Sequence, residues 1–175
     1  MHPPSDIRSD ALPVTGRGLV RDDWIDYNGH MNVAYYVLAF DQGTDGLLDL
    51  FGLDADYRGR TAHSTFALEM HVTYKREIGH AEPYLITSRV LDADHKRIHM
   101  FHEMHHATEG WLAASNEVIT MHIDLTRRRS RAFPPEVQAR VDAMKAAHAQ
   151  LPRPAAAGHT IAIGQIGRAS CRERV

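Results

Sequence analysis

The sequence has almost no cysteine. Cys171 is the only one among 175 residues, and it lies in the terminal decapeptide Ile166 to Val175. That decapeptide matches the translation of a common sequencing-library adapter, so we expect residues 166–175 to take no part in the fold. The remainder of the chain then has no cysteine, which excludes disulfides and thiol chemistry.

Long apolar runs and a targeting segment are also missing. Asp41 interrupts the longest apolar stretch far short of the roughly 20 residues that span a bilayer. The residues that follow Met1 lack the basic and apolar regions of a signal peptide. These absences predict a cytoplasmic protein without a membrane partner.

Charge of neither sign dominates. Lys and Arg number 20 against 22 Asp and Glu, a formal net charge of −2, which gives no electrostatic case for nucleic acid. Hydrophobic residues make up 43% of the chain, enough at this length for one domain with its own core. We place that domain at residues 17–150 and expect a flexible Pro- and Ala-rich tail over residues 151–165.

One long helix is predicted from Val33 to Phe51. Its side chains on one face recur at spacings of four, three, four, three and four: Val33, Val37, Phe40, Thr44, Leu47 and Phe51. Asn32 directly before it is a suitable N-cap. Gly43 and Gly46 each cost about 1 kcal/mol in a helix interior. This cost predicts that the helix is buried and that a sheet passes close to its backbone at the glycines.

The rest of the chain reads as strands. Residues 66–75 alternate strictly between apolar and polar, as a half-buried strand does. Further strands are predicted over residues 17–24, 84–91, 97–106 and 111–124, a polar loop over residues 52–60, and a second helix opening at Pro134. The hairpin-length connections predict an antiparallel meander. The fold class is therefore α+β, with an antiparallel sheet wrapped around one long central helix.

The stretch before the helix carries the most specific motif. Asp26-x-Asn28-x-His30-x-Asn32-x-x-x-Tyr36 resembles the catalytic segment of plant acyl-carrier-protein thioesterases. The element order from residue 17 to residue 124 resembles the hotdog-fold thioesterases of the 4-hydroxybenzoyl-CoA thioesterase superfamily. Trp24 to Met31, followed by Phe40-Asp41 and Thr44-Asp45, is similar to the betainyl-CoA thioesterases of carnitine breakdown, including those fused to carnitine dehydrogenase.

The resemblance implies an acyl-CoA thioesterase that needs no cofactor. By this resemblance Asp26 acts as general base or nucleophile, and a backbone N–H at or near Val33 polarises the thioester carbonyl. Asn28 and His30 match residues that position substrate and water. Hotdog proteins close their open sheet edge by pairing subunits, which predicts a homodimer or homotetramer with active sites between subunits.

The acyl group is predicted from the same resemblance to be betainyl. A quaternary ammonium is held by aromatic faces, and Trp24, Tyr27 and Tyr35, with Glu69 as a carboxylate, are the candidate binding residues. The same aromatics suit a benzoyl or a medium aliphatic group, and they are also ordinary core residues. A hotdog module that binds acyl-CoA without cleaving it is the alternative in another functional class.

Plainer interpretations stand beside these roles. Asp26 before Asn28-Gly29 is also common turn chemistry, and Glu77, at the position of a further catalytic glutamate in the plant enzymes, is interpreted as a surface residue. The histidine-rich segment 99–106 alternates between strand faces and offers no closed ligand set, so no metal site is predicted.

Overall fold

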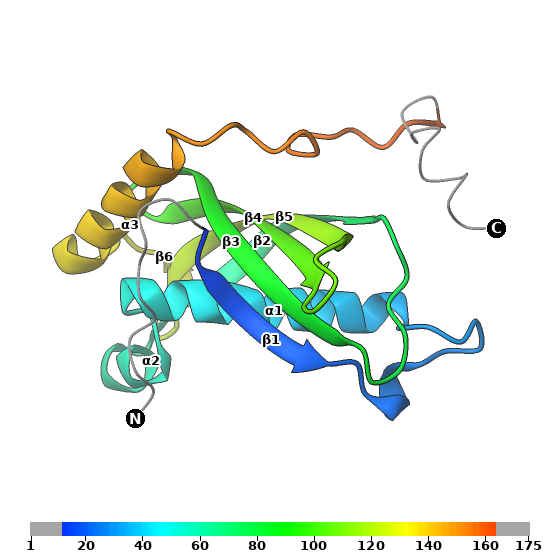
Figure 1. Ribbon diagram of the computed structural model, residues 1–175. Coiled ribbons are helices and arrows are strands. Elements are labelled where there is room, and N and C mark those ends of the chain that lie inside the picture. The colour runs from blue at the N-terminus through cyan, green and yellow to red at the C-terminus, as the bar shows by residue number, and fades with distance from the viewer. Residues whose placement is uncertain (1–11, 164–175) are drawn as a thin grey trace.

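The structure is a computed structural model that describes residues 12–163, and within them an antiparallel sheet curls around one helix (Figure 1). The sheet has the order β1-β3-β4-β5-β2, with the short β6 pairing with β5. The strands are β1 (Val14–Leu19), β2 (His63–Tyr74), β3 (Pro83–Ala93), β4 (Arg97–His106), β5 (Leu112–Asp124) and β6 (Arg129–Ser130). The predicted α+β hotdog fold is confirmed.

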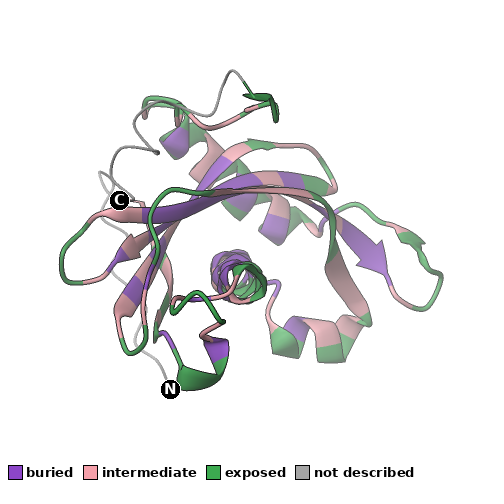
Figure 2. Cartoon of the chain, turned by 90° about the vertical axis from the view of Figure 1, so that its right-hand side faces the viewer, coloured by how far each residue is buried: buried purple, intermediate pink, exposed green. Residues whose placement is uncertain are grey.

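Helix α1 (Val33–Phe51) has the predicted bounds. The Asn32 side chain caps it by accepting a hydrogen bond from the Ala34 N–H at 3.0 Å. At the other end Gly52 adopts the left-handed conformation, φ 81°, that commonly closes a helix. Figure 2 looks along the helix, whose buried residues face the curved sheet. The N-terminal end of α1 is therefore fixed by a side chain of the motif itself.

The two helix glycines lie where the sheet comes closest. A Cβ on Gly43 would stand 2.9 Å from Cγ2 of Ile86 on β3, and one on Gly46 would overlap the Thr15 carbonyl oxygen of β1. Contacts this short leave no room for a methyl group. The predicted close passage of the sheet is confirmed at both positions.

Strand β2 departs from the predicted strict alternation. Its pairing with β5 shifts between Ala67 and Glu69, so that Phe66 lies opposite Met121 and Met70 opposite Val118. Because Met121 and Val118 fall on opposite faces of β5, the bulge at Leu68 places the side chains of Phe66 and Met70 on opposite faces of the sheet. β2 is an edge strand, and the exposed fractions of Phe66 and Leu68 are 39% and 50%.

Two segments differ from the sequence prediction. The strand expected over residues 17–24 ends at Leu19, and the 3-10 helix η1 (Asp22–Trp24) follows. The loop expected over residues 52–60 contains helix α2 (Ala55–Thr61), because the Asp54 carboxylate accepts a hydrogen bond from the Tyr57 N–H at 2.7 Å and caps it. Both corrections concern short elements whose stability depends on local caps.

The C-terminal part begins with α3 (Pro135–His148), which opens with proline as predicted. From there the chain crosses the outside of the sheet (Figure 1), where the Gly158 N–H donates to the Glu117 carboxylate at 2.6 Å. The sequence predicted a flexible tail over residues 151–165 and gave no indication of this contact.

Residues 166–175, predicted to be translated adapter, lie outside the described residues. Among the helices of residues 12–163, none combines the length and the hydropathy of a membrane span.

Candidate active site

The motif forms a closed turn between η1 and α1. Ile25 and Met31 make an antiparallel bridge, and inside it the Asp26 N–H donates to the His30 carbonyl at 3.1 Å. Gly29 sits at the tip with φ 84°, a conformation that favours glycine. The Met31 N–H donates to the Ile78 carbonyl at 2.9 Å, which ties the turn to the segment after β2. The turn is therefore anchored on both sides of its tip.

The Asp26 carboxylate is oriented by two donors. One oxygen accepts from the Asn28 backbone N–H at 2.8 Å, and the other accepts from the Asn32 side-chain amide at 3.2 Å. Asp26 is half-buried. Each carboxylate oxygen has a second lone-pair site, so the group can still bind or deprotonate a water molecule. The two donors fix the orientation of this carboxylate.

Asn32 joins this carboxylate to the helix. Its amide nitrogen donates to Asp26 while its amide oxygen accepts from the Ala34 N–H, as the cap of α1. The sequence predicted only the cap. The second role has no signal in the sequence, since it depends on the fold of the six-residue turn.

The first N–H of the helix is free for a substrate oxygen. Within residues 12–163 the backbone N–H of Val33 has no acceptor, and the Val33 side chain is 56% exposed. This N–H also stands at the positive end of the α1 dipole. A thioester oxygen placed there gains a donor and a favourable field, which is the arrangement of an oxyanion hole.

His30 lies on the other side of the turn. Its Nδ1 is 3.3 Å from the Met31 carbonyl oxygen and its Nε2 is 3.6 Å from a Glu77 carboxylate oxygen. Glu77 is exposed, as interpreted from the sequence, and it faces His30, which the sequence did not indicate. Neither side chain bonds to the Asp26 carboxylate. The structure therefore gives the turn two acids, at Asp26 and at Glu77.

The predicted substrate-binding residues do not converge within one chain. Trp24 is buried and stacks on Tyr35, with ring centroids 5.2 Å apart and planes inclined by 9°. Tyr27 is 96% exposed. Glu69 lines a separate cavity of about 380 Å³ beside His99 and strand β5. Only the pair of Trp24 and Tyr35 is brought together near the motif.

Tyr36, the last residue of the motif, forms a buried wall behind the site. Burial raises the pKa of Tyr36 to about 12, and a hydrogen bond to the backbone of Ile78 acts in the opposite direction. Its ring meets Tyr74 edge-on at 5.2 Å. A neutral phenol at this place ties α1 to the same segment that anchors the turn.

The described residues hold no prepared metal centre. Within residues 12–163 there is no group of three or more His, Cys, Asp or Glu side chains placed to hold a metal ion. The chemistry available at the turn is that of a carboxylate, a helix N-terminal N–H and a histidine with its acid.

Comparison with known proteins shows the family of this chain. The chain is 36% identical to the betainyl-CoA thioesterase of Pseudomonas aeruginosa, over 84% of this chain and 92% of that protein. It is 34% identical to the L-carnitine dehydrogenase/betainyl-CoA thioesterase of a Rhizobium species over 79% of this chain, which spans 28% of that longer protein. The structure of a Staphylococcus aureus protein in complex with CoA matches with a TM-score of 0.80 and 31% identity, over 87% of this chain and 96% of that one. The family model described as thioesterase-like superfamily matches residues 20–141, and the chain belongs to this superfamily.

Proposed function

We propose that the chain hydrolyses an acyl-CoA to the free acid and CoA, with Asp26 as the catalytic carboxylate. The observation that carries the proposal is the double role of Asn32, which binds the Asp26 carboxylate and caps the helix whose first free N–H belongs to Val33. One side chain thus holds the base and the oxyanion donor in a fixed relation. Preorganised donors of this kind usually make the greatest contribution to the rate of acyl transfer.

The reaction needs only groups at this turn. Asp26 takes a proton from a water molecule, whose oxygen attacks the thioester carbonyl while the Val33 N–H donates to the developing oxyanion. The tetrahedral intermediate then expels the CoA thiolate, which receives the proton that Asp26 had taken. In the alternative route the Asp26 carboxylate attacks the carbonyl itself and the C–S bond breaks, which expels the CoA thiolate and leaves a mixed anhydride. Water then cleaves the anhydride to the free acid and Asp26, and a proton released from this water goes to the thiolate. Turnover in oxygen-18 water labels Asp26 only in the second route.

Asn28 and His30 are proposed to position substrate and water. The Asn28 side chain is exposed and, within the described residues, has no partner, so its amide is available. His30 is held by Met31 and faces Glu77. Both belong to the same turn as Asp26, and neither side chain forms a hydrogen bond with its carboxylate. This arrangement suits residues that contact the thioester rather than attack it.

The test of the catalytic role is Asp26→Asn. The substitution keeps size and hydrogen-bonding reach but removes the base, and we expect turnover to fall at least about a hundredfold, a usual scale for general acid–base help. The matched control is Asp23→Asn, which removes an exposed carboxylate paired with Arg21 in the preceding η1 helix. Release of CoA thiol measures both. If Asp26→Asn keeps its activity, Glu77 and Glu69 become the candidate bases.

We further propose betainyl-CoA as the substrate, with betaine as the product in carnitine breakdown. The support is the likeness to relatives that carry this name. The half-buried Tyr35, which stacks on Trp24 with one face only, is the candidate aromatic contact. Aromatic faces attract a quaternary ammonium by about 0.5 to 2 kcal/mol each. The deciding measurement is kcat/KM for betainyl-CoA beside butyryl-CoA and 4-hydroxybenzoyl-CoA. A preference for either neutral substrate would leave a thioesterase for another acyl group.

A homodimer or homotetramer is part of the proposal. The edge strand β2 exposes Phe66 and Leu68, and the open side of α1 exposes Val33 and Val37. An uncovered apolar edge favours pairing with a second copy. Sedimentation tests this: an active monomer at micromolar concentration would contradict it.

A further inference from the structure

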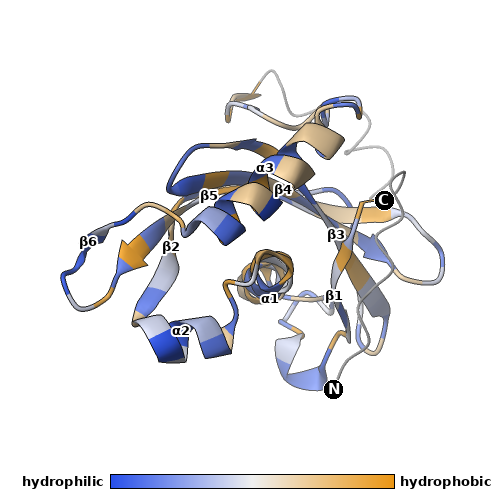
Figure 3. Ribbon diagram, turned by 90° about the vertical axis from the view of Figure 1, so that its left-hand side faces the viewer, coloured by the Kyte–Doolittle hydropathy of each residue, from blue (hydrophilic) through white to orange (hydrophobic). Residues whose placement is uncertain are grey.

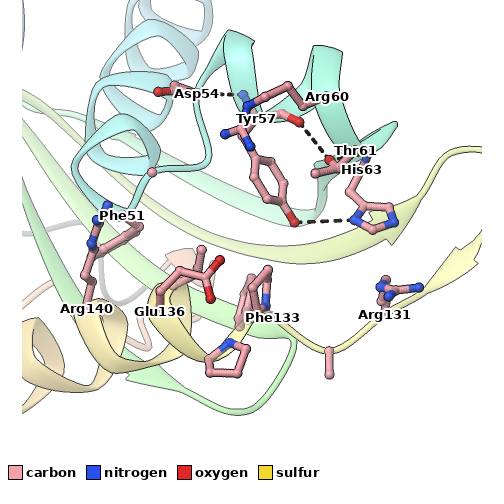
Figure 4. Close-up of a pocket in the computed structure, with 15 residues that line it drawn as sticks. Phe51, Asp54, Tyr57, Arg60, Thr61, His63, Arg131, Phe133, Glu136 and Arg140 are labelled. Carbon is pink, nitrogen blue, oxygen red and sulfur yellow. Dashed lines mark hydrogen bonds between the residues drawn. The ribbon is translucent and has the colours of Figure 1, made fainter.

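A second candidate site lies at the opposite end of α1 from Asp26. A cavity of about 730 Å³ opens there, lined by residues of α2, the start of β2, the segment after β6 and the start of α3 (Figure 4). Figure 3 shows α2 and α3 on either side of α1 at this end of the molecule. Helix α1 has 19 residues, so its ends lie about 28 Å apart at 1.5 Å per residue. The cavity is therefore separate from the Asp26 turn of the same chain.

Three arginines from three different segments line this cavity. Arg60 comes from α2, Arg131 follows β6, and Arg140 belongs to α3. Arg131 has a long contact of 3.8 Å to Asp124, while Arg60 and Arg140 have no ion pair within residues 12–163. Each guanidinium has five N–H donors, most of which are unused here. The cavity therefore offers many donors to an anion.

The carboxylates of the cavity only partly offset this charge. Asp54 and Glu136 line it as well, but one oxygen of Asp54 already accepts from the Tyr57 N–H as the cap of α2. Three guanidinium groups against two carboxylates leave a net positive lining. An anionic ligand is favoured over a cationic one.

The aromatic wall of the cavity is rigidly held. The Tyr57 hydroxyl is 2.9 Å from Nε2 of His122 and 3.4 Å from Nδ1 of His63, and Nδ1 of His122 is 3.0 Å from the Arg131 carbonyl oxygen. Phe51 and Phe133 complete the apolar lining. Burial raises the pKa of the Tyr57 hydroxyl.

Gly52 makes room for one of the arginines. A Cβ on Gly52, whose φ is 81°, would stand 2.6 Å from a terminal nitrogen of Arg140. Arg140 therefore lies against the C-terminal end of α1, where the helix dipole favours a cation. The Arg140 side chain is exposed, and its guanidinium lies beside Gly52 at the mouth of the cavity.

We propose that this cavity binds an adenosine phosphate. Its volume lies within the range of about 300 to 1,000 Å³ of small-molecule sites. Arginine is suited to bidentate phosphate contacts, and the small exposed edges of Tyr57 and Phe133 give the base an apolar contact. Two sources supply this chemistry. One is a free nucleotide. The other is the nucleotide end of acyl-CoA bound at the turn of a partner subunit, and this source alone rests on the proposed function.

Direct binding tests the site without reference to activity. Calorimetry with 3′-phosphoadenosine 5′-phosphate on the full chain should give a Kd below about 100 μM, with much weaker binding of adenosine and of inorganic phosphate. In Arg60→Gln/Arg131→Gln/Arg140→Gln the affinity should fall at least about tenfold, since charged hydrogen bonds are lost. Arg153→Gln, at an exposed arginine outside the cavity, is the matched control. No binding by the wild type, or equal affinity in the triple variant, overturns the proposal.

Kinetics then separate the two sources. If the bound nucleotide belongs to the substrate, the triple variant raises KM for acyl-CoA and leaves KM for the matching acyl-pantetheine unchanged, because the latter lacks the nucleotide. If the ligand is a free nucleotide, both KM values stay as in the wild type while the binding of 3′-phosphoadenosine 5′-phosphate is lost. An inactive protein that still binds the nucleotide would refute the proposed function and leave this site standing.

Discussion

His102, buried between α1 and the sheet, should make the protein sensitive to mild acid. The side chain is 0% exposed, and burial lowers its pKa from 6.5 to about 3. Its hydrogen bonds suit the neutral ring. The Thr44 hydroxyl donates to the Phe40 carbonyl at 3.0 Å, so toward His102 it can only accept, from the Nε2–H at 3.2 Å. The proton of the neutral ring is then on Nε2, and Nδ1 accepts a hydrogen bond from the Ser88 hydroxyl at 2.6 Å. A second ring proton has no acceptor unless this chain of hydroxyls reverses.

The sign of the effect follows from linkage. Because the folded pKa of His102 lies below the unfolded value, the unfolded state binds more protons between about pH 6.5 and pH 3, and stability falls as the pH falls through this window. At pH 5 the loss relative to pH 7.5 amounts to about 2 kcal/mol from this residue. A loss of that size is a large part of an ordinary domain's stability.

The assay is a difference between two proteins. His102→Gln cannot titrate, and its amide can still donate to Thr44. At pH 7.5 the variant should have a lower free energy of unfolding than the wild type in urea. At pH 5 this difference should be smaller by about 2 kcal/mol. Other histidines are common to both proteins and cancel. The control His95→Asn changes an exposed histidine and should follow the wild type. A stability gap that stays constant with pH refutes the reasoning. If His102→Gln does not fold, proton NMR of the wild type decides, since a ring titrating near pH 6 contradicts the burial argument.

Two further substitutions test how α1 is held. Gly46→Ala should destabilise the protein by about 1 to 3 kcal/mol, since the methyl group overlaps the Thr15 carbonyl. The control Gly59→Ala, at a position of helix α2 with no atom near the added methyl group, should raise the free energy of unfolding by up to about 1 kcal/mol. Equal effects of the two substitutions on thermal unfolding would show that the close approach is unimportant. Asn32→Asp keeps the oxygen that caps α1 but loses the donor to Asp26, so turnover should fall at least tenfold with Tm near the wild-type value, and an unchanged kcat would remove Asn32 from the site.

The sequence predicts those parts of the fold that are governed by local periodicity. The bounds of α1 follow from one apolar face, and the close approach at Gly43 and Gly46 follows from their cost in a helix. The bulge at Leu68 does not follow, because Phe66, Leu68 and Met70 have the same spacing with or without it. Only pairing with β5 decides where the extra residue goes. Helix α2 was missed because its cap, Asp54, is also a common loop residue.

The candidate site divides in the same way. Asp26 and Val33 lie seven residues apart in one turn and helix start, so a short motif is enough to indicate them. The facing pair of His30 and Glu77 joins segments that are 47 residues apart. Local spacing carries no information about such a pair. The aromatic residues proposed for the substrate were chosen by type, and only Trp24 and Tyr35 turn out to touch.

The two ends of α1 show why one end was predictable from sequence and the other was not. At its N-terminus a single turn supplies the cap, the acid and the free N–H, so the positive end of the dipole and the residues that use it are adjacent in the chain. At its C-terminus the negative end is met by Arg140, and the cavity around it draws Arg60 and Arg131 from segments that periodicity does not connect. A helix with one face buried along its length is fixed at both ends relative to the sheet. The same burial that accounts for its glycines therefore holds the Asp26 turn and the arginine-lined cavity at a constant separation.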